Sequence, residues 1–129
     1  MLRALAPGAS ARFVELVRML GKKSLDPFAL AELHDFLQAL GSAEFVQALR
    51  TSPDARLDDV SANQLAAMIE TRAARLGVRP PEWVELISPL RRPWFATELL
   101  GLRAHLLCHS PAAFRRRNLF VDATLGDRV

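Results

Sequence analysis

The chain has a single cysteine, Cys108, so no disulfide bond can form within it. We therefore expect a reducing, cytoplasmic setting. It also lacks an apolar run of about 18 residues, the length that a membrane-spanning helix requires. The apolar stretch among its first residues is too short for a signal peptide. These absences together predict a soluble protein that does not enter a membrane.

Catalytic signatures are missing as well. The sequence contains no glycine-rich phosphate loop, no Walker pattern, no serine-centred elbow and no Cys-x-x-Cys pair. The adjacent acids Asp58 and Asp59 precede a predicted helix, where negative charge stabilises the helix end without taking part in chemistry. We therefore expect a protein that is not an enzyme and that needs no cofactor.

One arrangement could hold a metal ion. His105 and His109 are spaced i, i+4 on one predicted helix, with Cys108 beside them. A zinc site needs further ligands, which would have to come from His34 or from a distant acid. Cys108 also lies near the end of that helix, where the helix dipole disfavours a thiolate. The sequence therefore predicts neither a metal site nor a cysteine nucleophile.

The charge is modest in size but uneven in distribution. The net charge is +3 over 129 residues, of which half are apolar. Residues 1–78 hold nine basic and nine acidic side chains, whereas residues 79–129 hold eight arginines against five acids. Arginine presents a rigid fork of donors that suits carboxylate or phosphate. An acidic protein and a nucleic-acid backbone are both compatible partners, although +3 is low for a dedicated DNA-binding protein.

Residues typical of helix starts and stops recur along the chain. They enclose segments with apolar residues at helical spacing. The pattern predicts an all-α fold, a single compact domain of five to seven helices over residues 1–129. The expected helices are Ser10 to Gly21, Asp26 to Gly41, Ser42 to Leu49, Ser61 to Gly77, Pro81 to Ile87, Phe95 to Cys108 and Ser110 to Asn118.

After Asn118 the pattern changes to the apolar, β-prone residues Leu119, Phe120 and Val121. No second strong strand signal exists elsewhere in the sequence. We therefore expect an extended C-terminal tail packed on the helices. The alternative is a strand that is added to the sheet of a partner.

The run Arg115-Arg116-Arg117 follows the aromatic Phe114. Consecutive helical residues point about 100° apart, so three arginines cannot all serve one flat surface. We expect one of them to pair internally with an acid such as Asp122 or Glu98. The run is compatible with exposed and with internally paired arginines, and the exposed ones would contact acids or phosphates.

A DNA-binding alternative depends on residues 61–78, which resemble the first helix of a helix-turn-helix. A recognition helix should follow after a turn of about 3–4 residues. The chain continues instead with Arg79-Pro80-Pro81-Glu82-Trp83, which does not extend cleanly into such a helix. A transcriptional regulator that places its arginine cluster on phosphates is kept as the alternative function.

Residues 80–129 resemble a group of short, mostly uncharacterised bacterial proteins. The shared order of motifs is Pro81-Glu82-Trp83, then Pro93-Trp94-Phe95, then Leu102-Arg103-Ala104, then Ser110 to Val121. The last motif reads Ser-Pro-x-x-Phe-Arg-Arg-Arg-Asn-x-Phe-Val, and the helix over residues 61–77 follows the same general pattern. The resemblance implies an antitoxin-like protein whose partner is a neighbour-encoded, nucleotidyltransferase-type toxin. It implies no catalytic residues.

These observations predict a non-enzymatic bacterial protein-interaction partner that docks through its aromatic- and arginine-rich C-terminal subregion, residues 80–129. Aromatic residues and arginine dominate the binding energy of protein interfaces. The expected partner-binding residues are Trp83, Trp94, Phe95, Phe114, Arg115, Arg116, Arg117 and Phe120.

Overall fold

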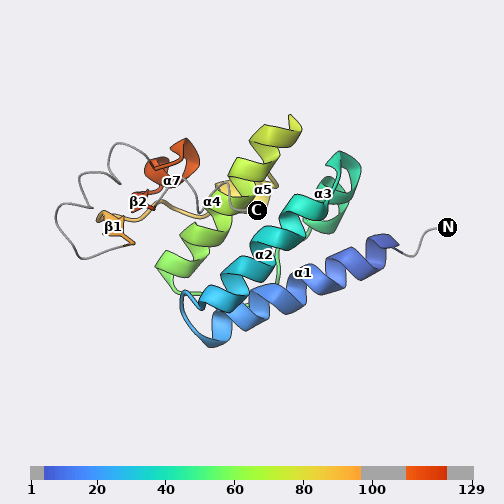
Figure 1. Ribbon diagram of the computed structural model, residues 1–129, viewed down its shortest axis with the longest axis horizontal. Helices are drawn as coiled ribbons and strands as arrows, with labels where there is room; N and C mark the ends of the chain where they lie inside the picture. Colours follow the sequence, from blue (N-terminus) through green and yellow to red (C-terminus); the bar gives the residue numbers. More distant parts are fainter. Residues whose placement is uncertain (1–4, 97–109, 122–129) are drawn as a thin grey trace.

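A computed structural model describes residues 5–96 and 110–121 of the chain (Figure 1). The described part is mostly helical, which confirms the predicted all-α fold. The helices are α1 (Leu5–Lys22), α2 (Pro27–Ala39), α3 (Ser42–Ala48), α4 (Asp59–Leu76), α5 (Glu82–Glu85) and α7 (Ala112–Arg116). Two short strands, β1 (Trp94–Phe95) and β2 (Leu119–Phe120), accompany them. No helix among these residues is both long enough and apolar enough to span a bilayer.

Helix α1 begins at Leu5, five residues before the predicted start at Ser10. The prediction was wrong because Pro7 falls in the first turn, where backbone N–H groups have no partner within the helix and proline is tolerated. The apolar face was predicted correctly, since Phe13 and Leu16 are fully buried, together with Val17 and Leu20. This face packs against α2 and α3.

Helix α2 starts as the sequence predicts. The Asp26 side chain accepts a hydrogen bond from the Phe28 N–H at 3.1 Å, and Pro27 occupies the first helical position. At the other end, the helix stops at Ala39, and Gly41 is the residue that precedes α3. The guanidinium of Arg72, on α4, donates to the carbonyls of Leu37 and Gln38 in the last turn of α2 and of Leu40, the residue that caps it. This cation satisfies carbonyls that the helix end leaves without partners.

Helix α4 begins at Asp59, and its cap is Asp58 rather than the predicted Ser61. The Asp58 carboxylate accepts from the Ser61 N–H at 2.7 Å. Ser61 itself is buried, and its hydroxyl lies 3.3 Å from the hydroxyl of Ser24, in the α1–α2 turn. Gly77 ends the helix as predicted, in the left-handed conformation at φ 71°.

The C-terminal residues correct two predictions. Strands β1 and β2 form a parallel pair in which Trp94 is opposite Leu119 and Phe95 is opposite Phe120. Phe95 is therefore a strand residue and not the start of a helix. Residues 119–120 are extended and buried against the helices as predicted, but they pair with β1, a strand that the sequence did not indicate. Residues 122–129, where the rest of the predicted tail falls, lie outside the described residues.

Two clusters of buried apolar side chains form the core, and α4 contributes to both. The larger cluster joins α4 to α1, α2 and α3. The smaller contains Ala67 of α4 with Phe114, Leu119 and Val121. Figure 1 shows α7, β1 and β2 grouped at one end of the molecule beside α4. Helix α4 thus connects the N-terminal helices to the segment that carries the predicted partner-binding residues.

Candidate functional site

Arg117 is the centre of the most extensive polar network in the described residues. Its side chain makes a forked pair with Glu70, with Nε 2.8 Å from Oε1 and Nη2 3.1 Å from Oε2. Nη1 donates to the Asn63 side-chain oxygen and to the Ile87 carbonyl, each at 2.8 Å. Nη2 also donates to the Val84 carbonyl at 3.0 Å. All five N–H groups of the guanidinium therefore have acceptors inside the protein.

The network decides the role of Arg117. Only 5% of the residue is exposed, so it is not available to a partner, and its predicted place among the docking residues is wrong. The expected internal pairing of one arginine is present, but with Glu70 of α4. The acids named from the sequence, Glu98 and Asp122, lie outside the described residues. A buried ion pair is favourable only when its remaining donors are satisfied, as they are here.

The residues after Arg117 extend the same attachment. Asn118 adopts the left-handed conformation at φ 63°, as its place after a short helix predicts. Its side-chain amide donates to the Leu90 carbonyl at 2.7 Å, and the Leu90 N–H donates to the Arg117 carbonyl at 3.2 Å. The Trp94 N–H donates to the Asn118 carbonyl at 2.8 Å. Residues 90–94 therefore run directly beside the end of α7.

The three predicted phenylalanine anchors are mainly structural. Phe114 and Phe120 are buried in the protein, which contradicts their assignment as partner contacts. Phe95 is partly buried and stacks on Phe120 across the strand pair, with ring centroids 5.0 Å apart. These rings hold α7 and the two strands together, as aromatic pairs do in protein cores.

The two tryptophans are also half-buried and belong to different clusters. Trp83 packs against the larger cluster beside Phe13, and its indole N–H donates to the Leu49 carbonyl at 2.7 Å. Trp94 packs against the smaller cluster. The predicted aromatic docking surface is therefore not assembled in the described residues.

Four arginines remain exposed in this region, and we call them the arginine cluster: Arg91, Arg92, Arg115 and Arg116. The hydrogen bonds of residues 90–94 to residues 117–118 bring the two pairs into one neighbourhood. Within the part of the chain that the structure describes, none of the four makes an ion pair. Their charge is therefore free to meet carboxylates or phosphates.

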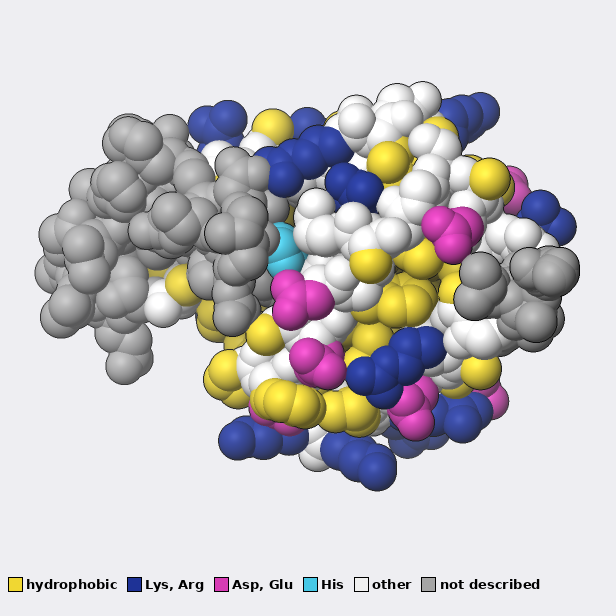
Figure 2. All heavy atoms as spheres, turned by 45° about the vertical axis from the view of Figure 1, so that its right-hand side comes forward, with side chains coloured by type: hydrophobic (Ala, Val, Ile, Leu, Met, Phe, Trp, Pro, Cys, Tyr) yellow, Lys and Arg dark blue, Asp and Glu magenta, His cyan; other side chains and the backbone are white. Residues whose placement is uncertain are grey.

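The wider surface is mixed in sign. On the face shown in Figure 2, basic and acidic side chains alternate around areas of apolar side chains. Among the large apolar residues that the structure describes, Leu86 has the greatest exposed fraction, 81%, and it follows α5. A continuous basic face of the kind that follows a nucleic-acid backbone is not visible from this side.

The candidate metal ligands His105, Cys108 and His109 fall outside the described residues. Among residues 5–96 and 110–121, no three histidine, cysteine or acidic side chains come close enough to hold a metal ion. The fourth candidate, His34, is buried on α2.

Sequence reasoning missed the partners that fix Arg117. Glu70 lies 47 residues away along the chain and Asn63 lies 54 away. The helical spacing of i, i+7 places both on one side of α4, and a buried asparagine on an apolar face is the only signal that could have indicated the network.

Comparison of the chain with protein-family models, with curated proteins and with solved structures gave no match. The resemblance to antitoxin-like bacterial proteins therefore stays a prediction that depends on the motifs of residues 80–129.

Proposed function

We propose that this chain is a non-enzymatic bacterial protein-interaction partner, acting in the cytoplasm, that docks on an acidic protein through its arginine cluster. The observation that carries the proposal is that the arginines of one run differ in burial and in hydrogen bonding. Arg117 is buried and fully bonded, whereas its neighbours Arg115 and Arg116 are exposed and unpaired within the described residues.

The interior attachment supports docking because it fixes the position of the exposed charges. Arg117 joins α7 to α4 and to the α5 segment, and Asn118 joins it to residue 90. A surface that is already ordered loses less conformational entropy on binding than a flexible one. Complementary charge then accelerates association and selects against wrong partners.

One exposed apolar residue, Leu86, precedes two arginines of the cluster along the chain. Leu86 is largely exposed, and Arg91 and Arg92 follow it within a few residues. An apolar contact beside arginines is the composition that protein interfaces favour. The sequence resemblance suggests the kind of partner, a nucleotidyltransferase-type toxin that a neighbouring gene encodes.

The test is co-purification of the full chain with the product of the neighbouring gene. Replacing both Arg115 and Arg116 with Glu should reduce the recovered complex at least about tenfold, because like charges across an interface repel. Arg18 on α1 and Arg50 in the bend after α3 are exposed arginines and match the change in charge. Their double Glu variant should bind as well as the unmodified chain. If the Arg115 and Arg116 variant bound the partner as well as the Arg18 and Arg50 variant, docking through the cluster would be refuted.

DNA binding is measured in parallel with fluorescently labelled duplex DNA at about 50 mM salt, where non-specific association is strongest. Duplex binding with a log–log salt slope near −0.9 per phosphate, lost in the Arg115 and Arg116 variant, would replace the protein-docking proposal with the regulator alternative. Absence of DNA binding together with loss of the protein complex supports the proposal.

A further inference from the structure

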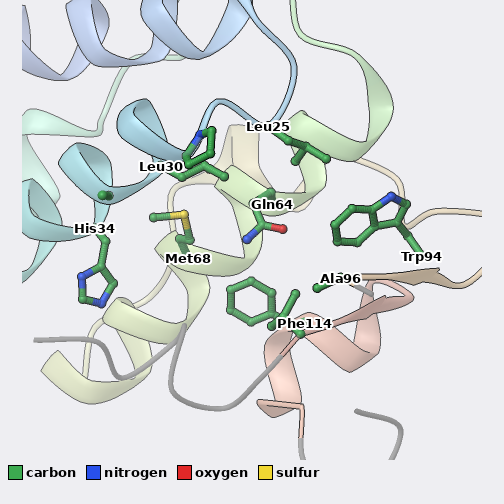
Figure 3. Close-up of a pocket in the computed structure, with 11 residues that line it drawn as sticks. Leu25, Leu30, His34, Gln64, Met68, Trp94, Ala96 and Phe114 are labelled. Carbon is green, nitrogen blue, oxygen red and sulfur yellow. The ribbon is translucent and has the colours of Figure 1, made fainter. Parts of the chain in front are cut away.

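A cavity of about 260 Å³ lies between the N-terminal helices and the C-terminal segment. Helix α2, the turn before it and α4 form one side, and β1, α7 and the end of β2 form the other (Figure 3). Most of its lining is apolar: Leu25, Pro27, Leu30, Ala31, Met68, Trp94, Ala96, Phe114 and Val121. The remaining two lining residues, His34 and Gln64, are polar.

Both polar residues are buried, and each has side-chain atoms without a hydrogen-bond partner in the described part of the protein. His34 is 6% exposed and Gln64 is 8% exposed. The two ring nitrogens of His34 and the Oε1 atom of Gln64 have no hydrogen-bond partner in the described part of the protein. His34 Nδ1 lies 3.5 Å from the Asp35 carboxylate, close enough for an ion pair when the ring is protonated but without hydrogen-bond geometry.

Unpaired buried polar groups are rare in folded proteins, because each gives up its hydrogen bonds to water without gaining one inside the protein. Two of them in the wall of one apolar cavity are the usual arrangement of a small-molecule site, in which a few polar groups orient an otherwise apolar ligand. Gln64, Trp94 and Phe114 border the same space in Figure 3, where the Gln64 amide is close to the aromatic rings.

We propose that this cavity binds a small, uncharged, mostly apolar molecule that carries a hydroxyl group. The hydroxyl would donate to Gln64 Oε1, and the apolar body would pack on Met68, Trp94 and Phe114. A cavity of about 150 Å³ already accommodates benzene, so the larger volume here fits a two-ring body.

The charges around the cavity decide between ligand classes. No lysine or arginine is among the described residues that line it. A carboxylate or phosphate placed there would be desolvated without a counter-charge, which is strongly unfavourable. The ligand class is therefore a neutral alcohol or phenol and not an acid. This site is separate from the arginine cluster, so the inference does not depend on the proposed docking function.

The probes are 2-naphthol, naphthalene and 2-naphthoate, titrated into the full chain by calorimetry. We expect saturable one-site binding of 2-naphthol. Naphthalene, which has the same rings without the hydroxyl, should bind about tenfold more weakly, the factor that one net hydrogen bond supplies. The anion 2-naphthoate should not bind. Equal affinities for 2-naphthol and naphthalene, tighter binding of 2-naphthoate, or no saturable binding of any probe would overturn the proposal.

Two substitutions locate the site. Gln64→Leu removes the acceptor and should bring the 2-naphthol affinity down to that of naphthalene, while Gln47→Leu, an exposed change on α3, should alter neither. Ala31→Phe fills the cavity from α2 and should abolish binding of both probes. An unchanged preference for 2-naphthol in folded Gln64→Leu protein, or undiminished binding by folded Ala31→Phe protein, would show that the probes bind elsewhere.

Discussion

Three consecutive arginines have different environments in this molecule. Arg115 and Arg116 are exposed, whereas Arg117 is buried with all its donors satisfied by Glu70, by Asn63 and by backbone carbonyls. The forked geometry of the guanidinium explains the choice of residue, because a lysine has only three donors and cannot bond two carboxylate oxygens in parallel. The ionic strength of the medium should affect the exposed pair far more than the buried one.

Replacement of Arg117 by Ala should lower the free energy of unfolding by about 3–5 kcal/mol, the usual loss when one partner of a buried ion pair is removed. Glu70, whose side chain is only 19% exposed, would lose the guanidinium that both of its carboxylate oxygens contact. Arg116→Ala is the matched control and should change the stability by no more than about 0.5 kcal/mol. Urea unfolding followed by circular dichroism measures both variants. Similar losses for the two would mean that Arg117 does not anchor α7.

At the scale of the element, α4 organises the fold from its first residue. Its cap, Asp58, accepts from the Ser61 N–H, and the buried Ser61 in turn contacts the turn between α1 and α2. The hydroxyl of Ser24, and then the backbone N–H of Ser61, hold the pKa of Asp58 below its ordinary value of 3.8. The Asp58 carboxylate therefore joins the start of α4 to the turn between α1 and α2.

The lowered pKa of Asp58 predicts a pH dependence of stability. The charged form is favoured in the folded state, so its contribution is present above pH 3.8 and is lost as the pH falls through the lower pKa of the folded protein. Asn also caps helices well but does not titrate in this range. Asp58→Asn should therefore lose less stability than the unmodified chain between about pH 6 and pH 3.

Urea midpoints at the two pH values test this expectation, with Asp54→Asn in the same loop as a control for the loss of one negative charge. If the unmodified chain and Asp58→Asn lose the same stability between the two pH values, the cap does not contribute to acid sensitivity. Asp58 is largely exposed, so solvent screens its charge. We therefore predict the direction of the difference in stability and not its size, and we expect added salt to reduce the difference.

On the scale of the whole molecule, α4 joins two clusters of apolar side chains. Met68 packs against both of them. Each cluster also has its own half-buried tryptophan, Trp83 in the larger and Trp94 in the smaller. This arrangement favours one cooperative unfolding transition, because the smaller cluster contains too few buried side chains to be stable without α4.

Single-tryptophan variants can test this cooperativity. Trp94→Phe leaves Trp83 to report on the larger cluster, and Trp83→Phe leaves Trp94 to report on the smaller. Within each variant, the urea midpoint by fluorescence should equal the midpoint by circular dichroism, because both clusters unfold together. A fluorescence midpoint of Trp94 well below the helical midpoint would show that the C-terminal segment detaches first.

Local sequence signals determined much of the helical framework. Asp26-Pro27, Gly77 and Asn118 act where they were expected, because caps and left-handed residues depend on backbone geometry within a few positions. The apolar face of α1 was likewise predictable, since the helical period alone places Phe13, Leu16 and Leu20 on one side. The all-α character of the fold follows from these short-range rules.

Tertiary structure alone decided the interior role of Arg117, the pairing of β1 with β2 and the cavity beside Gln64. Each depends on groups far apart in the chain: Arg117 meets a carboxylate 47 residues away, and the strands pair across 25 residues. Consecutive arginines are chemically identical in a sequence, and only the folded chain assigns one to the interior and two to the solvent. Burial and hydrogen-bond satisfaction are properties of the packed molecule, so no local pattern could distinguish the buried arginine from the two exposed ones.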